Sequence, residues 1–162
     1  MSSRLVVSMV DAASLCQRAY YEGDLCENSR GKRVFVVAGT RCVSDILTDA
    51  AAVIAGTIRG TSRYEREKER LEKEMSVDGG DPIVLAGHSL GGAVVLELAR
   101  EFKLPGVVFN PLWPRETVVP DNVEVYSAEG DPVSAKARML PSTHIITHPT
   151  AFAHFISNFI NS

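Results

Sequence analysis

Apolar residues along the chain fall into short continuous runs and into segments with helical spacing. The runs at residues 33–38, 83–86 and 107–109 are largely apolar and are flanked by glycine, proline or polar residues. Such runs predict strands that are covered on both faces. Residues 123–127 alternate apolar and polar side chains and predict a fourth strand, and residues 143–147 predict a fifth.

Helical spacing occurs before, between and after these strands. A first helix is predicted to begin at Ser8, which has Asp11 in position for a capping box. The last helix is predicted after Pro149 and Thr150, with an apolar face of Phe152, Phe155, Ile156 and Phe159. The polar segment 22–32 is predicted as a loop, and segment 45–55 fits either a short helix or a strand. The helices are predicted at residues 8–21, 62–77, 90–102 and 150–159.

The alternation of strands and helices predicts an α/β fold with a mostly parallel central sheet and helices on both faces. The 162 residues suffice for one domain with a sizeable core, spanning residues 1–162. A chain of this length leaves no room for a large cap domain.

The helix at residues 62–77 is highly charged and has only a narrow apolar stripe of Tyr64, Leu71 and Met75. A mobile lid or a partner-binding helix would fit this pattern. A solvated surface helix packed on the sheet fits it better, because an incomplete apolar face is ordinary for such helices.

The segment 83–100 carries the strongest chemical signal in the chain. The strand prediction ends at Gly87-His88-Ser89-Leu90-Gly91, and a helix is predicted directly afterwards. Gly-x-Ser-x-Gly between a strand and a helix is typical of a nucleophile elbow, in which a strained turn exposes the serine hydroxyl. Small residues are needed on both sides of the serine, and Gly87 and Gly91 meet this need. Gly92 is expected to let the helix approach the sheet.

A serine hydroxyl becomes an effective nucleophile only when a base removes its proton and an acid orients that base. The expected chain order is serine, acid, histidine, with the last two in loops that follow later strands. Asp131 follows the fourth predicted strand and is the preferred acid. Asp121 is a weaker candidate because it precedes that strand.

Two histidines, His148 and His154, follow the fifth predicted strand, and spacing alone does not choose between them as the base. His144 lies inside that strand and is interpreted as structural. His88 is adjacent to Ser89, so we expect its side chain to point elsewhere and to line the oxyanion or substrate pocket. The developing oxyanion needs two donors, for which we expect Leu90 N–H and Thr40.

These motifs resemble the class 3 (fungal lipase-like) lipases of the α/β-hydrolase group. The resemblance places the acid on Asp131, the base on His154 and an oxyanion residue on Thr40. The shorter stretch before Ser89 argues against the full lid of the secreted enzymes. Residues 87–92 are identical to the family's Gly-His-Ser-Leu-Gly-Gly elbow. Residues 36–49 resemble its oxyanion region, and residues 106–111 resemble one of its strand ends. Residues 127–134 resemble its acid loop, and residues 153–159 resemble the segment that carries its histidine.

A net charge of −3 and the absence of a basic stripe give no reason to expect nucleic-acid binding. Three cysteines and no signal-peptide pattern suggest reduced thiols and an intracellular location. No stretch reaches membrane-spanning length. Transient contact with a lipid surface is compatible with a lipid substrate, and the oligomeric state is left open.

The sequence therefore predicts a serine hydrolase of carboxylic esters, most consistent with a lipase or phospholipase-like esterase without a metal or organic cofactor. An apolar acyl groove is expected to include Leu112, Trp113 and Phe155. A thioesterase or a short-chain, cutinase-like esterase is the first alternative. A non-catalytic binding module with the same fold is the second.

Overall fold

Six strands form one sheet in the order β1-β2-β3-β4-β5-β6. The computed structural model describes residues 7–39, 58–113, 118–147, 149 and 154–160. The first pair of strands is antiparallel, and each later pair of neighbours is parallel. The mostly parallel sheet predicted from the sequence is therefore confirmed. The strands are β1 (Leu25–Ser29), β2 (Lys32–Val37), β3 (Ile83–His88), β4 (Gly106–Phe109), β5 (Val123–Ala128) and β6 (His144–Ile146).

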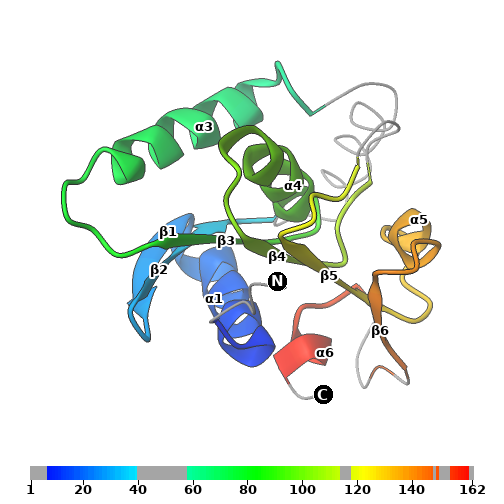
Figure 1. The fold of residues 1–162 in the computed structure, drawn as a ribbon. Helices are drawn as coiled ribbons and strands as arrows, with labels where there is room; N and C mark the ends of the chain where they lie inside the picture. Colours follow the sequence, from blue (N-terminus) through cyan, green and yellow to red (C-terminus); the bar gives the residue numbers. More distant parts are fainter. Residues whose placement is uncertain (1–6, 40–57, 114–117, 148, 150–153, 161–162) are drawn as a thin grey trace.

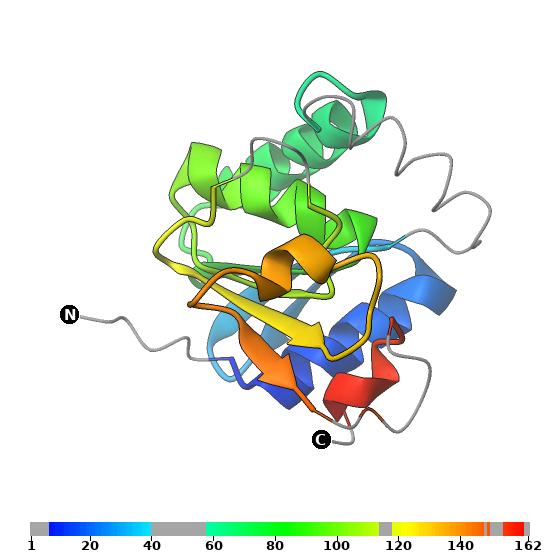
Figure 2. The same cartoon turned by 90° about the vertical axis from the view of Figure 1, so that its right-hand side faces the viewer.

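Helices cover both faces of this sheet (Figure 1). One face carries α3 (Ser62–Met75) and α4 (Leu90–Phe102), and the other carries α1 (Met9–Glu22) and α6 (Ser157–Ile160). The short α5 (Ala135–Arg138) follows β5, and Figure 2 shows it on the opposite side of β5 and β6 from α6. Every described element belongs to the sheet or to its covering helices, and no cap domain occurs among them.

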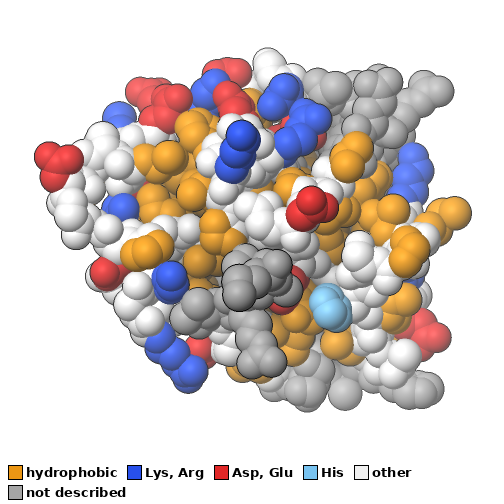
Figure 3. All heavy atoms as spheres, in the orientation of Figure 1, with side chains coloured by type: hydrophobic (Ala, Val, Ile, Leu, Met, Phe, Trp, Pro, Cys, Tyr) orange, Lys and Arg blue, Asp and Glu red, His pale blue; other side chains and the backbone are white. Residues whose placement is uncertain are grey.

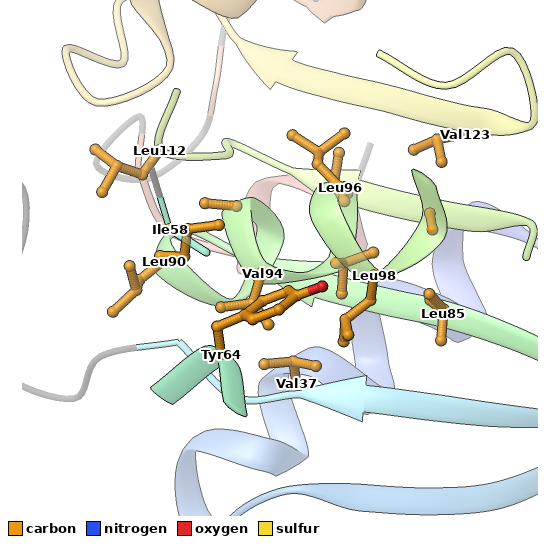
Figure 4. Close-up of a cluster of buried hydrophobic side chains, with 14 of the residues drawn as sticks. Val37, Ile58, Tyr64, Leu85, Leu90, Val94, Leu96, Leu98, Leu112 and Val123 are labelled. Atoms are coloured by element: carbon orange, nitrogen blue, oxygen red, sulfur yellow. The ribbon is translucent and has the colours of Figure 1, made fainter. Parts of the chain in front are cut away.

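Alternating side chains of the strands feed two hydrophobic clusters. Phe35 and Val37 of β2 face the α4 side, and Val34 and Val36 face the α1 side. All four side chains have no solvent exposure. Figure 4 shows the cluster around α4, where Val94 and Leu98 approach Tyr64 of α3. Burial of each such side chain contributes roughly 1.5–3 kcal/mol to folding, which fixes the sheet between the two helical layers.

The charged helix α3 is held against the molecule by Tyr64 and Leu71, which are 2% and 0% exposed. Glu67, on the same face, is also fully buried and forms ion pairs with Arg70 and Arg63. Figure 3 shows acidic and basic side chains interspersed over this part of the surface. These contacts support the interpretation as a surface helix. Met75 was expected in the apolar stripe but is 43% exposed, because it lies in the last turn of the helix.

The segment 22–32 was predicted as a loop, and this prediction is wrong. It contains the edge strand β1, joined to β2 by Arg30 and Gly31, which both have positive φ values of 48° and 78°. A two-residue hairpin turn of the common type requires positive φ at both positions. The strand was missed because its sequence is largely polar, as an edge strand with one partner permits.

The final helix is shorter than predicted. It begins at Ser157, so His154 lies in a turn before the helix instead of within its first turns. Phe155 is 54% exposed, whereas Ile156 and Phe159 are buried against the α1 side of the sheet. Phe152 and the segment 45–55 lie outside the described residues.

Candidate active site

Ser89 lies in the sharp turn between β3 and α4. Its backbone angles, φ 57° and ψ −122°, are seldom adopted by residues with a side chain and cost about 1–3 kcal/mol. The glycines on each side allow this turn. A Cβ at Gly91 would lie 2.3 Å from the Val37 carbonyl oxygen, and one at Gly87 would lie 2.5 Å from the Gly91 carbonyl oxygen.

The expected role of Gly92 needs a correction. A Cβ at this position would meet Pro111 at 3.1 Å, so Gly92 allows close approach of the chain after β4. Gly91 is the glycine that brings α4 against the end of β2. The strained turn is also held by its own backbone, because Ser89 N–H donates to Phe109 O at 3.1 Å and Leu112 N–H donates to Ser89 O at 3.1 Å.

Three side chains that are distant in sequence form a continuous hydrogen-bonded chain at the carboxyl ends of the parallel strands. His154 Nε2 lies 2.9 Å from Ser89 Oγ, and His154 Nδ1 lies 3.0 Å from Asp131 Oδ1. An ionised carboxylate only accepts hydrogen bonds, so Nδ1 carries the imidazole proton. Nε2 is then the acceptor for the Ser89 hydroxyl proton. The geometry thus brings together Ser89, Asp131 and His154.

Asp131 is fully buried and its carboxylate accepts four hydrogen bonds. Oδ1 accepts from His154 Nδ1 and from Val133 N–H at 3.2 Å, and Oδ2 accepts from the backbone N–H and the hydroxyl of Ser134. Burial alone would raise the pKa of the Asp131 carboxyl, but the hydrogen bonds from His154, Ser134 and Val133 outweigh it and hold the pKa below its ordinary value. Asp131 is therefore a carboxylate at neutral pH.

His88 was expected to line the oxyanion or substrate pocket, and the structure shows its ring in contact with other parts of the protein. Its side chain is buried, and Nε2 donates to the carbonyl oxygen of His154 at 2.7 Å. The hydroxyl of Tyr20, from α1, donates to the other ring nitrogen. Burial, together with the nearby His154, lowers the pKa of His88 to about 3, so the ring stays neutral. His88 thus holds the backbone of His154 from the α1 side of the sheet.

The other residues expected in the site differ in where the structure places them. Leu90, whose N–H was expected to stabilise an oxyanion, begins α4 directly after Ser89, where the first N–H groups of a helix have no partner within that helix. Leu112 and Trp113 are only 4% and 8% exposed and belong to the core cluster around α4. Phe155 is exposed beside His154. Thr40 and His148 lie outside the described residues.

Several residues around this site carry no recognisable sequence motif. The sequence analysis singled out none of Tyr20, Ser134 and Arg138 as candidate site residues. The four-residue helix α5 was also not predicted, because it is too short to show helical periodicity.

Two features are absent from the described part of the chain. No helix among these residues combines the length and the apolar character needed to cross a membrane. The His, Cys, Asp and Glu side chains in the same ranges form no group of three that would suit a metal ion.

Residues 26–157 match the Alpha/beta hydrolase family. A crystal structure of a serine hydrolase without a lid, from Xanthomonas campestris, is similar at 19% identity and a TM-score of 0.47, over 74% of this chain and 69% of that chain. At that level of similarity it adds no argument about the site. No curated protein matches the chain. Because the family match covers most of the sequence and agrees with the predicted fold, the chain belongs to the α/β-hydrolase family.

Proposed function

We propose that the chain is a serine hydrolase of carboxylic esters, with Ser89 as nucleophile, His154 as base and Asp131 as the acid. The hydrogen-bonded series Ser89–His154–Asp131 is the observation that carries this proposal. Its geometry supports the arrangement of protons that acyl transfer requires: a hydroxyl beside an unprotonated Nε2, and an Nδ1–H beside a carboxylate.

The reaction begins when Ser89 Oγ attacks the acyl carbon and its proton passes to His154 Nε2. The carbonyl oxygen becomes an oxyanion, for which Leu90 N–H and the positive end of α4 supply stabilisation. Asp131 stabilises the imidazolium that forms. The tetrahedral intermediate then expels the alcohol, which takes the proton from His154. A water molecule, activated by the same nitrogen, releases the acid and restores Ser89.

The burial of this site bears on how substrate reaches it. Ser89 has no solvent exposure and His154 is 7% exposed. The proposal therefore requires the residues around the hydroxyl to move so that an ester carbonyl can enter. Exclusion of water in the closed state strengthens the electrostatic interactions that stabilise the oxyanion and the imidazolium.

Lipid esters are the substrate class that the resemblance to class 3 lipases favours. One observation favours short acyl chains as the alternative. Leu112 and Trp113, two of the three residues expected to line an acyl groove, are packed in the core around α4. A long acyl chain would need other apolar residues, whereas a short-chain ester or thioester would not.

Hydrolysis of p-nitrophenyl esters, from acetate to palmitate, tests both parts of the proposal. We expect turnover by the wild-type chain and a loss of at least about a thousandfold in kcat for Ser89→Ala and His154→Ala. His148→Ala is the matched control and should keep activity. The preferred chain length separates a lipase from a short-chain esterase. Equal activity of Ser89→Ala and the wild-type chain would overturn the proposal.

A further inference from the structure

A second polar network adjoins the Asp131 carboxylate through Ser134. Its members come from the ends of β4 and β5, from the loop after β5 and from α5. Ser127, Ser134 and Asn110 have no solvent exposure, although all three are polar. Buried polar groups are costly unless each finds a partner, and a buried network whose members all have partners fixes the geometry of the groups that it joins.

The direction of each hydrogen bond in the network follows from the chemistry of its ends. Arg138 Nη1 can only donate, and it donates to Ser127 Oγ at 3.0 Å and to Ala128 O at 2.9 Å. At the other end, the Asp131 carboxylate can only accept, so the proton between it and Ser134 Oγ belongs to the serine.

The middle of the chain is then determined as well. Because Ser134 commits its one hydroxyl proton to Asp131, the 2.6 Å contact between Ser127 Oγ and Ser134 Oγ must use the proton of Ser127. Asn110 Oδ1 accepts from Ala128 N–H at 2.8 Å, which fixes its amide, and its 3.2 Å contact with Ser134 Oγ is the weaker share of the same proton. One path of hydrogen bonds therefore runs from the guanidinium of Arg138 through the hydroxyls of Ser127 and Ser134 to the carboxylate, and Arg138 Nη1 also donates directly to Ser134 Oγ in a longer contact of 3.3 Å.

We propose that Arg138 is a positioning residue that acts through Ser127 and Ser134 to hold the Asp131 carboxylate, and that this chain sets how strongly Asp131 supports His154 as a base. The proposal rests on the proposed function of the Ser89–His154–Asp131 series. Hydrogen bonds in a chain polarise one another, and the cation at its start increases the donor strength of each hydroxyl. The carboxylate is thereby stabilised as an anion of moderate basicity.

The consequence for pH dependence can be given a sign. Loss of the Arg138 cation or of the Ser134 hydroxyl leaves the carboxylate more basic. A more basic carboxylate stabilises more strongly the positive charge that His154 carries when it has accepted a proton. The acid limb of the kcat/KM profile should move upward by about half a pH unit. Among the described residues, the titratable groups in contact with His154 include Asp131 and His88, whose ring centroid lies 4.9 Å from that of His154, with Tyr20 beyond His88.

Four variants test the chain: Arg138→Gln, Arg138→Lys, Ser134→Ala and the double variant Arg138→Gln/Ser134→Ala. Lys136→Gln is the matched control, because it removes one positive charge from an exposed position on the same helix. We expect Arg138→Gln to shift the acid limb upward and to lower kcat about three- to tenfold with KM unchanged. Arg138→Lys should restore part of both effects. Lys136→Gln should change neither.

The double variant distinguishes a chain from a general charge effect. If Arg138 acts through Ser134, adding Arg138→Gln to Ser134→Ala should change the pH profile no further. Additive shifts in the double variant, or equal shifts for Lys136→Gln and Arg138→Gln, would overturn the proposal.

A measurement that does not need activity separates this proposal from the proposed function. The NMR resonance of the His154 Nδ1 proton, assigned with His154→Gln, should move downfield in Ser134→Ala and in Arg138→Gln but not in Lys136→Gln. That result in a protein without esterase activity would retain the chain and reject the catalytic role. An active enzyme whose proton resonance and pH profile are the same in all variants would reject the chain alone.

Discussion

Replacement of Tyr20 by phenylalanine removes one hydroxyl from a buried contact on which the position of His154 depends. The hydroxyl donates to His88 Nδ1, and His88 Nε2–H donates to the His154 carbonyl oxygen at 2.7 Å. Burial raises the pKa of Tyr20, so the hydroxyl keeps its proton and remains a donor. The two bonds together fix the tautomer of His88, because each end of its ring then has a single compatible role.

The size of the effect on stability follows from the buried ring nitrogen of His88 that Tyr20→Phe leaves without a donor. His88 is 3% exposed, so its Nδ1 would be a buried acceptor without a donor, which costs about 1–3 kcal/mol of unfolding free energy. For a chain of this size the melting temperature should fall by about 3–10 °C. The other tautomer of His88 also becomes accessible and would place a lone pair against the His154 carbonyl. We expect kcat to fall about tenfold, equivalent to about 1.4 kcal/mol, with KM unchanged.

Urea unfolding and p-nitrophenyl acetate kinetics measure the two effects. Tyr21→Phe is the matched control, because it makes the same chemical change at the next position, where the side chain is 80% exposed. The control should match the wild-type chain in both assays. If Tyr20→Phe unfolds at the same urea concentration as Tyr21→Phe and retains full kcat, the reasoning about His88 is refuted.

Three further predictions concern the elbow and its neighbour. Below pH 6.5 the unfolded chain protonates His88, whereas burial lowers the pKa of His88 in the folded chain to about 3. The unfolding free energy should therefore fall as the pH decreases across this interval, by up to about 1.4 kcal/mol per pH unit. Urea unfolding at several pH values should show a weaker pH dependence for His88→Gln, and the same dependence as in the wild-type chain would count against the burial argument. Ser89→Gly should be about 1 kcal/mol more stable than Ser89→Ala, because glycine adopts the φ of 57° without strain; the reverse order in thermal unfolding would show that the turn is not strained. Gly91→Ala should lower the unfolding free energy by about 2–4 kcal/mol, since its Cβ would lie 2.3 Å from Val37 O. Gly92→Ala should lower it by less than about 1 kcal/mol, because its Cβ would meet Pro111 at 3.1 Å. Similar losses for both variants would contradict the close approach of α4 to β2.

The elbow could be predicted from the sequence because its constraints are local. A strained turn between a buried strand and a helix requires small residues at a fixed spacing, and the glycines around Ser89 have that spacing. The sheet could be predicted for a similar reason, since strands buried on both faces consist of continuous, largely apolar runs. The polar edge strand β1 lies outside this rule, because within the described residues only β2 pairs with it and its side chains are partly exposed.

The partners of the site could be predicted only in part because they depend on contacts between distant segments. Spacing alone did not choose between His148 and His154 as the base, and only the resemblance to class 3 lipases favoured His154. The position of Asp131 after a strand narrowed the acid to one preferred residue. No local pattern marks Tyr20 as the partner of His88, since the two are brought together by packing of α1 under β3. The same holds for Arg138, whose role depends on the direction in which a four-residue helix leaves the acid loop.

The most direct test of the account is covalent labelling of the folded wild-type chain with a fluorophosphonate, followed by mass spectrometry of the modified peptide. We expect one adduct per chain on Ser89 at neutral pH, absent in Ser89→Ala and at least about a hundredfold slower in His154→Ala. An adduct on another residue, or no adduct in a chain that remains folded under the same conditions, would contradict the claim that His154 and Asp131 activate Ser89.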